Sequence, residues 1–147
     1  MTVARADLVN ARSLILPFVL VLTAAMLVVQ IVIIVEGGVP GLYSGILTGI
    51  VALGIAVWVR HWYRTLLRVR FGIAIVHASA FAAVTTSFNL HGLVQVLITS
   101  GGQGFEAAAG LLLSTPWFGV TLGMSALWGL GLMVHLLGAI LGRGWED

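Results

Sequence analysis

Charged residues are scarce in this 147-residue chain. Only 8% of the residues are Asp, Glu, Lys or Arg, whereas 60% are hydrophobic and the mean hydropathy is +1.12. A soluble domain carries roughly 25% charged residues, so a water-soluble fold of this length would lack the polar side chains that cover its surface. The lipid bilayer must therefore be the solvent for most of the chain.

Two residue types are missing altogether. The chain has no cysteine, which excludes disulfides, zinc–thiolate sites, iron–sulfur clusters and thiol catalysis. It also has no lysine, so the seven basic residues are all arginines. The net charge is only +2, and the placement of the arginines is explained by membrane topology. We therefore predict no nucleic-acid partner.

Four uncharged stretches are long enough to cross a membrane. We predict helices over residues 13–35, 41–59, 71–98 and 117–141, because a span needs about 20 mostly apolar residues and unpaired backbone groups are too costly in lipid. The first stretch exceeds the roughly 7–15 apolar residues of a signal peptide, so we expect it to be retained. The predicted fold is an all-α membrane protein, a four-transmembrane-helix bundle. It is divided into two antiparallel hairpins, residues 1–63 and 64–147.

The arginines divide the chain into two sides. They lie before the first span, between the second and third spans, and after the fourth: Arg5, Arg12, Arg60, Arg64, Arg68, Arg70 and Arg143. The other two connections, residues 36–40 and 99–116, contain glutamate and no arginine. Positively charged loops stay on the cytoplasmic side. We therefore predict a multi-pass protein of the cell membrane with both termini in the cytoplasm.

Aromatic and basic residues gather at the predicted inner ends of the spans. Tryptophan, tyrosine and arginine favour the membrane interface, so we expect these residues to anchor the chain to the lipid bilayer. The predicted anchors are Trp58, Trp62, Trp145, Arg60, Arg64, Arg68 and Arg70. Trp117 and Tyr43 are expected at the outer surface. The loop that contains residues 101–115 is expected to be either a short interfacial helix or a packed loop.

Small residues recur four positions apart in the second and fourth spans. This spacing lets helix backbones approach closely. The predicted packing residues are Gly41, Gly45, Gly49, Gly119, Gly123, Gly138 and Gly142. Two interpretations remain open, packing between helices of one chain and a homodimer or other membrane-protein contact.

The second half of the chain carries a more specific pattern. It consists of Phe71, His77 and Phe81 on the third span, Trp128-Gly129-Leu130-Gly131-Leu132-Met133-Val134-His135 on the fourth, and a trailing Trp145-Glu146. This pattern resembles the 2TM domain family over residues 64–147. The resemblance implies a two-helix membrane hairpin, found alone or fused to signalling proteins such as histidine kinases. The family has a tyrosine where Phe81 stands and a shorter loop between its helices.

His77 and His135 form the strongest constellation in the sequence. At 1.5 Å per residue, both lie roughly 10–12 Å inside the predicted cytoplasmic boundary, so an antiparallel hairpin would place them at the same depth. Three interpretations are open. Each imidazole could hydrogen-bond across the helix interface, the pair could bind a b-type heme or a metal ion, or the pair could act as a protonatable switch.

Other polar residues are expected to have local roles. We expect His61 to face lipid headgroups and Gln30 to hydrogen-bond between helices. His91 lacks a partner at its depth on the fourth span, so we expect an outer-leaflet contact with Asn89 or Gln95.

No phosphate-binding glycine loop, zinc-protease motif or nucleophile elbow is present in the sequence. We therefore predict a non-enzymatic membrane module with a structural or signalling-associated role. The alternative is a small heme- or metal-binding membrane protein that uses His77 and His135 as ligands.

Overall fold

The computed structural model describes residues 11–141 and places every regular element of this range in a helix. In chain order the elements are α1 (Ala11–Val35), α2 (Leu42–Leu66), α3 (Gly72–Gln103), α4 (Phe105–Leu113), α5 (Thr115–Phe118), the π-helix η1 (Gly119–Gly123) and α6 (Met124–Leu141). Four segments are long and apolar enough to cross a membrane: Arg12–Val35, Leu42–Leu66, Gly72–Gln103 and Pro116–Leu141. The predicted all-helical fold with four helices long and apolar enough to span a membrane is confirmed.

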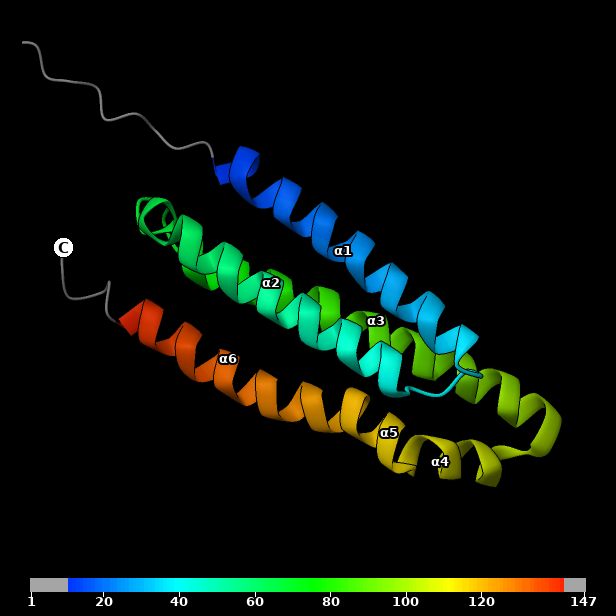
Figure 1. Cartoon of the computed structure of the whole chain (residues 1–147). Coiled ribbons are helices and arrows are strands. Elements are labelled where there is room, and N and C mark those ends of the chain that lie inside the picture. Colours follow the sequence, from blue (N-terminus) through cyan, green and yellow to red (C-terminus); the bar gives the residue numbers. More distant parts are fainter. Residues whose placement is uncertain (1–10, 142–147) are drawn as a thin grey trace, which may run out of the picture.

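The four long helices lie alongside one another, and the chain reverses direction at each connection (Figure 1). α1 contacts α2 and α3, and α3 also contacts α6. The start of α1, the end of α2, the start of α3 and the end of α6 lie at one end of the bundle. The short helices α4 and α5 lie at the other end, near the turn between α1 and α2.

The hydrophobic core lies at the interface between α1 and α3. Buried residues recur three to four positions apart on each helix, which is the spacing of one helix face. They are Phe18, Leu22, Met26, Val29 and Ile33 on α1, and Val76, Ala80, Val84 and Phe88 on α3. α3 is therefore the central helix of the bundle. α2 buries only Ser44 and Leu66, and no residue of α6 is buried.

A short turn joins α1 to α2. Gly37 and Gly38 have φ values of +96° and +80°, a region that glycine enters without a steric penalty. Their amides bond to the Ile34 and Ile33 carbonyls at 3.1 and 2.9 Å, and so close the end of α1. The turn is short, so the start of α2 lies close to the end of α1 (Figure 1).

Glu36 closes the same turn from the other side. Its carboxylate accepts hydrogen bonds from the amides of Gly41, Tyr43 and Ser44 at 3.2, 2.9 and 3.2 Å. These donors lie at the first turn of α2, where negative charge is favourable, and the Gly41 amide also donates to Ser44 Oγ at 2.9 Å. Hydrogen bonding with the Ser44 side chain and with these three amides lowers the pKa of Glu36. This glutamate is thus a helix cap.

At the opposite end of the bundle from the start of α1, the chain reverses direction between α3 and α4. Gly104 has a φ of +88° and separates α3 from α4, and α4 packs back onto α3 through the fully buried Ala108. The last span then begins with an irregular segment. The Met124 amide bonds to the Gly119 carbonyl five residues earlier, which is the bond of a π-helix.

Several predicted boundaries differ from the structure. α2 continues to Leu66 instead of ending at residue 59, so Arg60 and Arg64 lie on the helix and not in a loop. α3 continues to Gln103 instead of ending at residue 98. Of the two alternatives for the loop that contains residues 101–115, the short helix is found, as α4. Charged and aromatic residues near a span end are compatible with helix that extends beyond the apolar core, and composition alone does not mark where that helix stops.

The predicted packing glycines are mostly uncovered. A Cβ at Gly45, Gly49, Gly119 or Gly138 would meet no heavy atom within 4 Å. One at Gly41 would meet only the flexible Glu36 carboxylate, one at Gly123 would lie near the Phe118 carbonyl of its own span, and Gly142 lies outside the described residues. Within the chain, the four open positions therefore pack against no neighbouring helix. Close packing between helices instead occurs at Gly92, where a Cβ would lie 3.3 Å from the Thr121 side chain.

Candidate functional site

His77 and His135 meet near the end of the bundle where α3 starts and α6 ends. Their ring centroids are 4.8 Å apart and the rings are nearly perpendicular, at 81°. His77 lies five residues after the start of α3 and His135 six residues before the end of α6, so each is roughly 8–9 Å from its helix end. The expected pairing at matching depth is found.

The two imidazoles differ in their surroundings. His77 is half-buried, and its Nδ1 atom is buried with no hydrogen-bond partner. The Ile73 carbonyl one turn earlier lies close to this ring but outside hydrogen-bond geometry. His135 is exposed on the surface of α6. Hydrogen bonds from these rings across the helix interface, one of the three interpretations of the pair, are not found among residues 11–141.

A heme does not fit this pair. Axial ligation by two histidines needs the rings to face each other across the flat macrocycle, with one nitrogen on each side of the iron. Here one ring edge contacts the face of the other at 4.8 Å, so no slot separates them. A Cβ at Gly131 or Gly138 would meet nothing within 4 Å, so these glycines border open surface and not an enclosed slot.

A metal ion bound by one chain is also poorly supported. Two imidazoles in contact can share an ion, but a protein site normally supplies three or four ligands. Over residues 11–141, no group of three or more His, Asp or Glu side chains comes together. The pair therefore supplies two of the three or four ligands that a metal site needs.

His135 belongs to an uncovered face of α6. Gly131 is four residues before it and Gly138 three residues after it, so all three lie on the same helix face. All three are exposed, and both glycines would accept a side chain without meeting a neighbour. An exposed imidazole on a membrane span is unfavourable, and such residues face a bundle interior, a cavity or a partner.

The predicted anchors divide into two groups. Arg60, Arg64 and Trp62 are exposed on the last turns of α2, and Arg68 and Arg70 lie in the connection to α3. The Arg70 guanidinium lies 5.4 Å from the centre of the Phe71 ring. Trp58 instead packs inward, with its ring 4.3 Å from that of Phe18. Trp145 lies outside the described residues.

A directional chain of hydrogen bonds links α1 to α3 in the other half of the bundle. Gln95 Nε2 lies 3.3 Å from His91 Nε2, and His91 Nδ1 lies 2.8 Å from Gln30 Oε1. Gln30 Nε2 donates to Ser87 Oγ at 3.1 Å, and Ser87 donates to the Val84 carbonyl. Because Gln30 Oε1 can only accept, His91 carries its proton on Nδ1, and each donor then points the same way along the chain.

This chain of hydrogen bonds, which we call the Gln30–His91 network, has a structural role. It satisfies both nitrogens of His91 and links the C-terminal halves of α1 and α3. The four side chains lie in a groove of about 950 Å³ that is otherwise lined mainly by apolar residues of the two helices. The expected role of Gln30 as an interhelical hydrogen-bond partner is found. His91 contacts Gln95 as expected, whereas Asn89 bonds to Ser125 on α6 at 3.0 Å.

Trp117 is placed differently from its predicted position at the outer surface. Its side chain is fully buried, and its ring lies 5.2 Å from that of His91. Its Nε1 atom has no hydrogen-bond partner in the described structure. Trp117 is thus the core residue that holds the start of the last span against α3.

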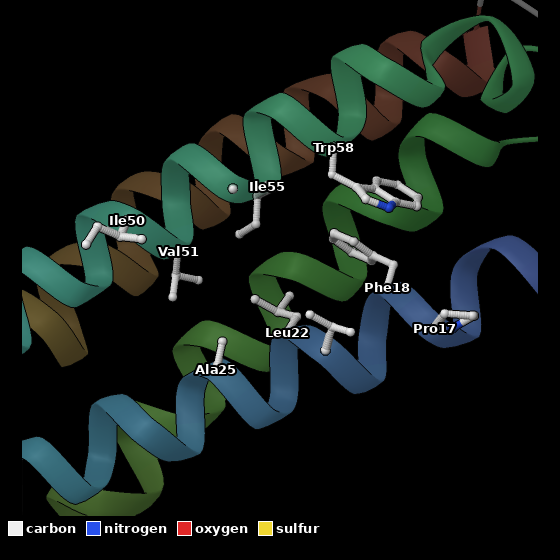
Figure 2. Close-up of a pocket in the computed structure, with 10 residues that line it drawn as sticks. Pro17, Phe18, Leu22, Ala25, Ile50, Val51, Ile55 and Trp58 are labelled. Atoms are coloured by element: carbon white, nitrogen blue, oxygen red, sulfur yellow. The ribbon is translucent and has the colours of Figure 1, made fainter.

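An apolar crevice of about 370 Å³ separates α1 from α2 (Figure 2). Phe18 and Leu22 of α1 and Val51, Ile55 and Trp58 of α2 point toward each other across it. The lining has no charged group.

No protein-family model, curated protein or solved structure matches this chain. The resemblance to the 2TM domain family therefore gains no support beyond the residues that suggested it.

Proposed function

We propose that this chain is a non-enzymatic integral membrane protein, a structural or signalling-associated module that assembles with a second copy of itself through the face of α6 that contains Gly131, His135 and Gly138. The observation that carries the proposal is the exposed His135 imidazole on a membrane span, with open glycines before and after it. Small residues allow two helix backbones to approach closely in lipid, and polar side chains between them supply hydrogen bonds.

A second copy would also bring further imidazoles close to His77. Its ring already contacts His135 at 4.8 Å while its Nδ1 atom lacks a partner. A symmetric contact brings the same residues of both copies to one interface, so four imidazoles would lie close together. The resemblance of residues 64–147 to the 2TM domain family is also part of this proposal, and it rests on the sequence pattern. Hairpins of that family occur alone or in signalling proteins, which is why we propose a structural or signalling-associated role.

Loss of the open glycines tests the assembly. We expect the double variant Gly131→Leu/Gly138→Leu to be monomeric in lipid bilayers where the unaltered chain is dimeric, because leucine at both positions prevents close backbone approach. Subunit counting by single-molecule photobleaching measures this. Gly54→Leu is the matched control, since Gly54 is also an open glycine within a span but lies on α2. A monomeric unaltered chain, or an unchanged dimer in the double variant, would contradict the proposal.

The orientation is a second part of the proposal. The described arginines lie at one end of the bundle, where α1 starts and α2 ends, and Glu36 and Glu106 lie toward the other end. Positive residues remain on the cytoplasmic side of a membrane. This placement supports two antiparallel hairpins with both termini in the cytoplasm and with α4 at the external surface of the membrane.

Reporter fusions test this orientation. We expect fusions after Gly38 and Gly102 to report the external side, and fusions after Arg64 and Asp147 to report the cytoplasm. The pairs of sites serve as controls for each other, because a protein inserted in the opposite sense would reverse both results.

A further inference from the structure

A second feature of the inner end is a cavity beside α2 that is lined by two arginines and two histidines and by no carboxylate of the described residues. Its volume is about 780 Å³. The side chains of Arg60, His61 and Arg64 from α2 and His77 from α3 line it. No carboxylate lines it, and the acidic residues within the described range are Glu36 and Glu106, on the connection after α1 and on α4.

The chemical character of the cavity changes along α2. Toward the middle of the span it is lined by Ala52, Ile55, Ala56 and Val59, which are small or apolar. Toward the end of the helix these give way to the arginines and to Tyr63. The lining residues recur every three to four positions and so follow one face of α2.

We infer that this cavity binds a phosphate-bearing anion at its Arg60–Arg64 end. Two guanidinium groups one helix turn apart supply forked donors that match phosphate oxygens, and neither has a competing carboxylate in the cavity. The imidazoles of His61 and His77 add further donors at the same end. The gradient from apolar to cationic lining matches a phospholipid, whose acyl chains lie deep and whose phosphate lies at the membrane surface.

The site is distinct from the proposed contact between chains. It is formed by α2 and α3, whereas the face that contains Gly131, His135 and Gly138 belongs to α6. Only His77 is close to both. A negative result for the anion site therefore does not contradict the proposed contact between chains, and a negative result for that contact does not contradict the anion site.

Two double variants with equal change in charge test the site. Arg60→Gln/Arg64→Gln removes both arginines that line the cavity. Arg68→Gln/Arg70→Gln removes two arginines from the adjacent connection, which do not line it. The probe is phosphatidylglycerol in a phosphatidylcholine nanodisc, and native mass spectrometry measures how much remains bound to the released protein. We expect roughly tenfold or greater loss of affinity for the first variant, and about twofold or less for the second.

Two further arms identify the source of the phosphate. Ala56→Leu fills the apolar part of the cavity and leaves its charges in place, so it should weaken retention of phosphatidylglycerol. Millimolar inorganic phosphate should displace the lipid only if the site takes a soluble anion. Either source supports a phosphate site.

A folding control keeps the charge at both positions. Arg60→Lys/Arg64→Lys is expected to retain part of the affinity, which would show that loss of binding in the glutamine variant does not come from loss of folding.

Equal losses in the two glutamine variants would show that the lipid responds to surface charge alone, and would overturn the inference. Unchanged retention in Arg60→Gln/Arg64→Gln would overturn it as well.

Discussion

Replacement of Trp117 by alanine is expected to destabilise the protein more than any other single change in the bundle. The side chain is fully buried among residues of α3, including Gly92, where a Cβ would already lie 3.5 Å from the indole. Removing it leaves a large cavity where the last span begins. Trp→Ala changes in cores cost about 3–5 kcal/mol, and we expect about 3 kcal/mol because separated membrane helices remain in lipid and not in water.

Unfolding by steric trapping in bicelles measures this free energy. Trp117→Phe is the conservative variant, because it keeps an aromatic ring and removes the indole N–H that has no partner. We expect that change to cost less than about 1.5 kcal/mol. Trp62→Ala is the control for loss of a tryptophan at an exposed position. Equal effects of Trp117→Ala and Trp62→Ala would be incompatible with Trp117 as a core residue.

Replacement of Gln30 by leucine is expected to have the second largest effect on stability. The change breaks the bonds of Gln30 with His91 and Ser87, and leaves His91 Nδ1 without its acceptor at the interface of α1 and α3. Hydrogen bonds between membrane helices contribute about 0.6 kcal/mol on average and up to about 1.7 kcal/mol. We expect a loss of about 1–2 kcal/mol, because two such bonds are removed.

A double-mutant cycle distinguishes the network from general packing. The double variant Gln30→Leu/His91→Leu should lose less free energy of unfolding than the sum of the losses in the two single variants. Each single change leaves the other polar side chain without its partner, whereas the double change removes both partners. Thr23→Val is the matched control on α1, since Thr23 lines the same groove. Strict additivity of the two leucine changes, or an equal effect of Thr23→Val, would argue against the network.

The spans themselves could be predicted because lipid imposes one dominant requirement. Residues 13–35, 71–98 and most of 117–141 are apolar over a membrane thickness, and the structure places a helix over each of these ranges. The continuation of α2 through Arg60 and Arg64 could not be inferred in this way. An arginine side chain can reach the interface from within a helix, so charge marks the membrane surface and not the helix end.

The partners of individual polar residues were less predictable. The depths of His77 and His135 follow from counting along two antiparallel helices, and their contact was expected for that reason. Trp117 was expected at the outer face of the membrane because tryptophan is common at membrane interfaces, but its neighbours His91 and Gly92 are distant in sequence, and packing against them buries its side chain. The π-helix η1 depends on backbone hydrogen bonds five residues apart, which no residue pattern identifies.

The absence of cysteine from the chain permits one direct measurement of the central claim, that two copies meet along α6. Gly131→Cys introduces a single thiol on the uncovered face, and Gly54→Cys introduces one on α2. A symmetric contact places equivalent residues against each other, and a disulfide forms only when the two Cα atoms are within about 7 Å. After oxidation in native membranes, we predict a cross-linked dimer for Gly131→Cys and none for Gly54→Cys. Equal cross-linking of the two variants, or none at Gly131→Cys, would contradict the account.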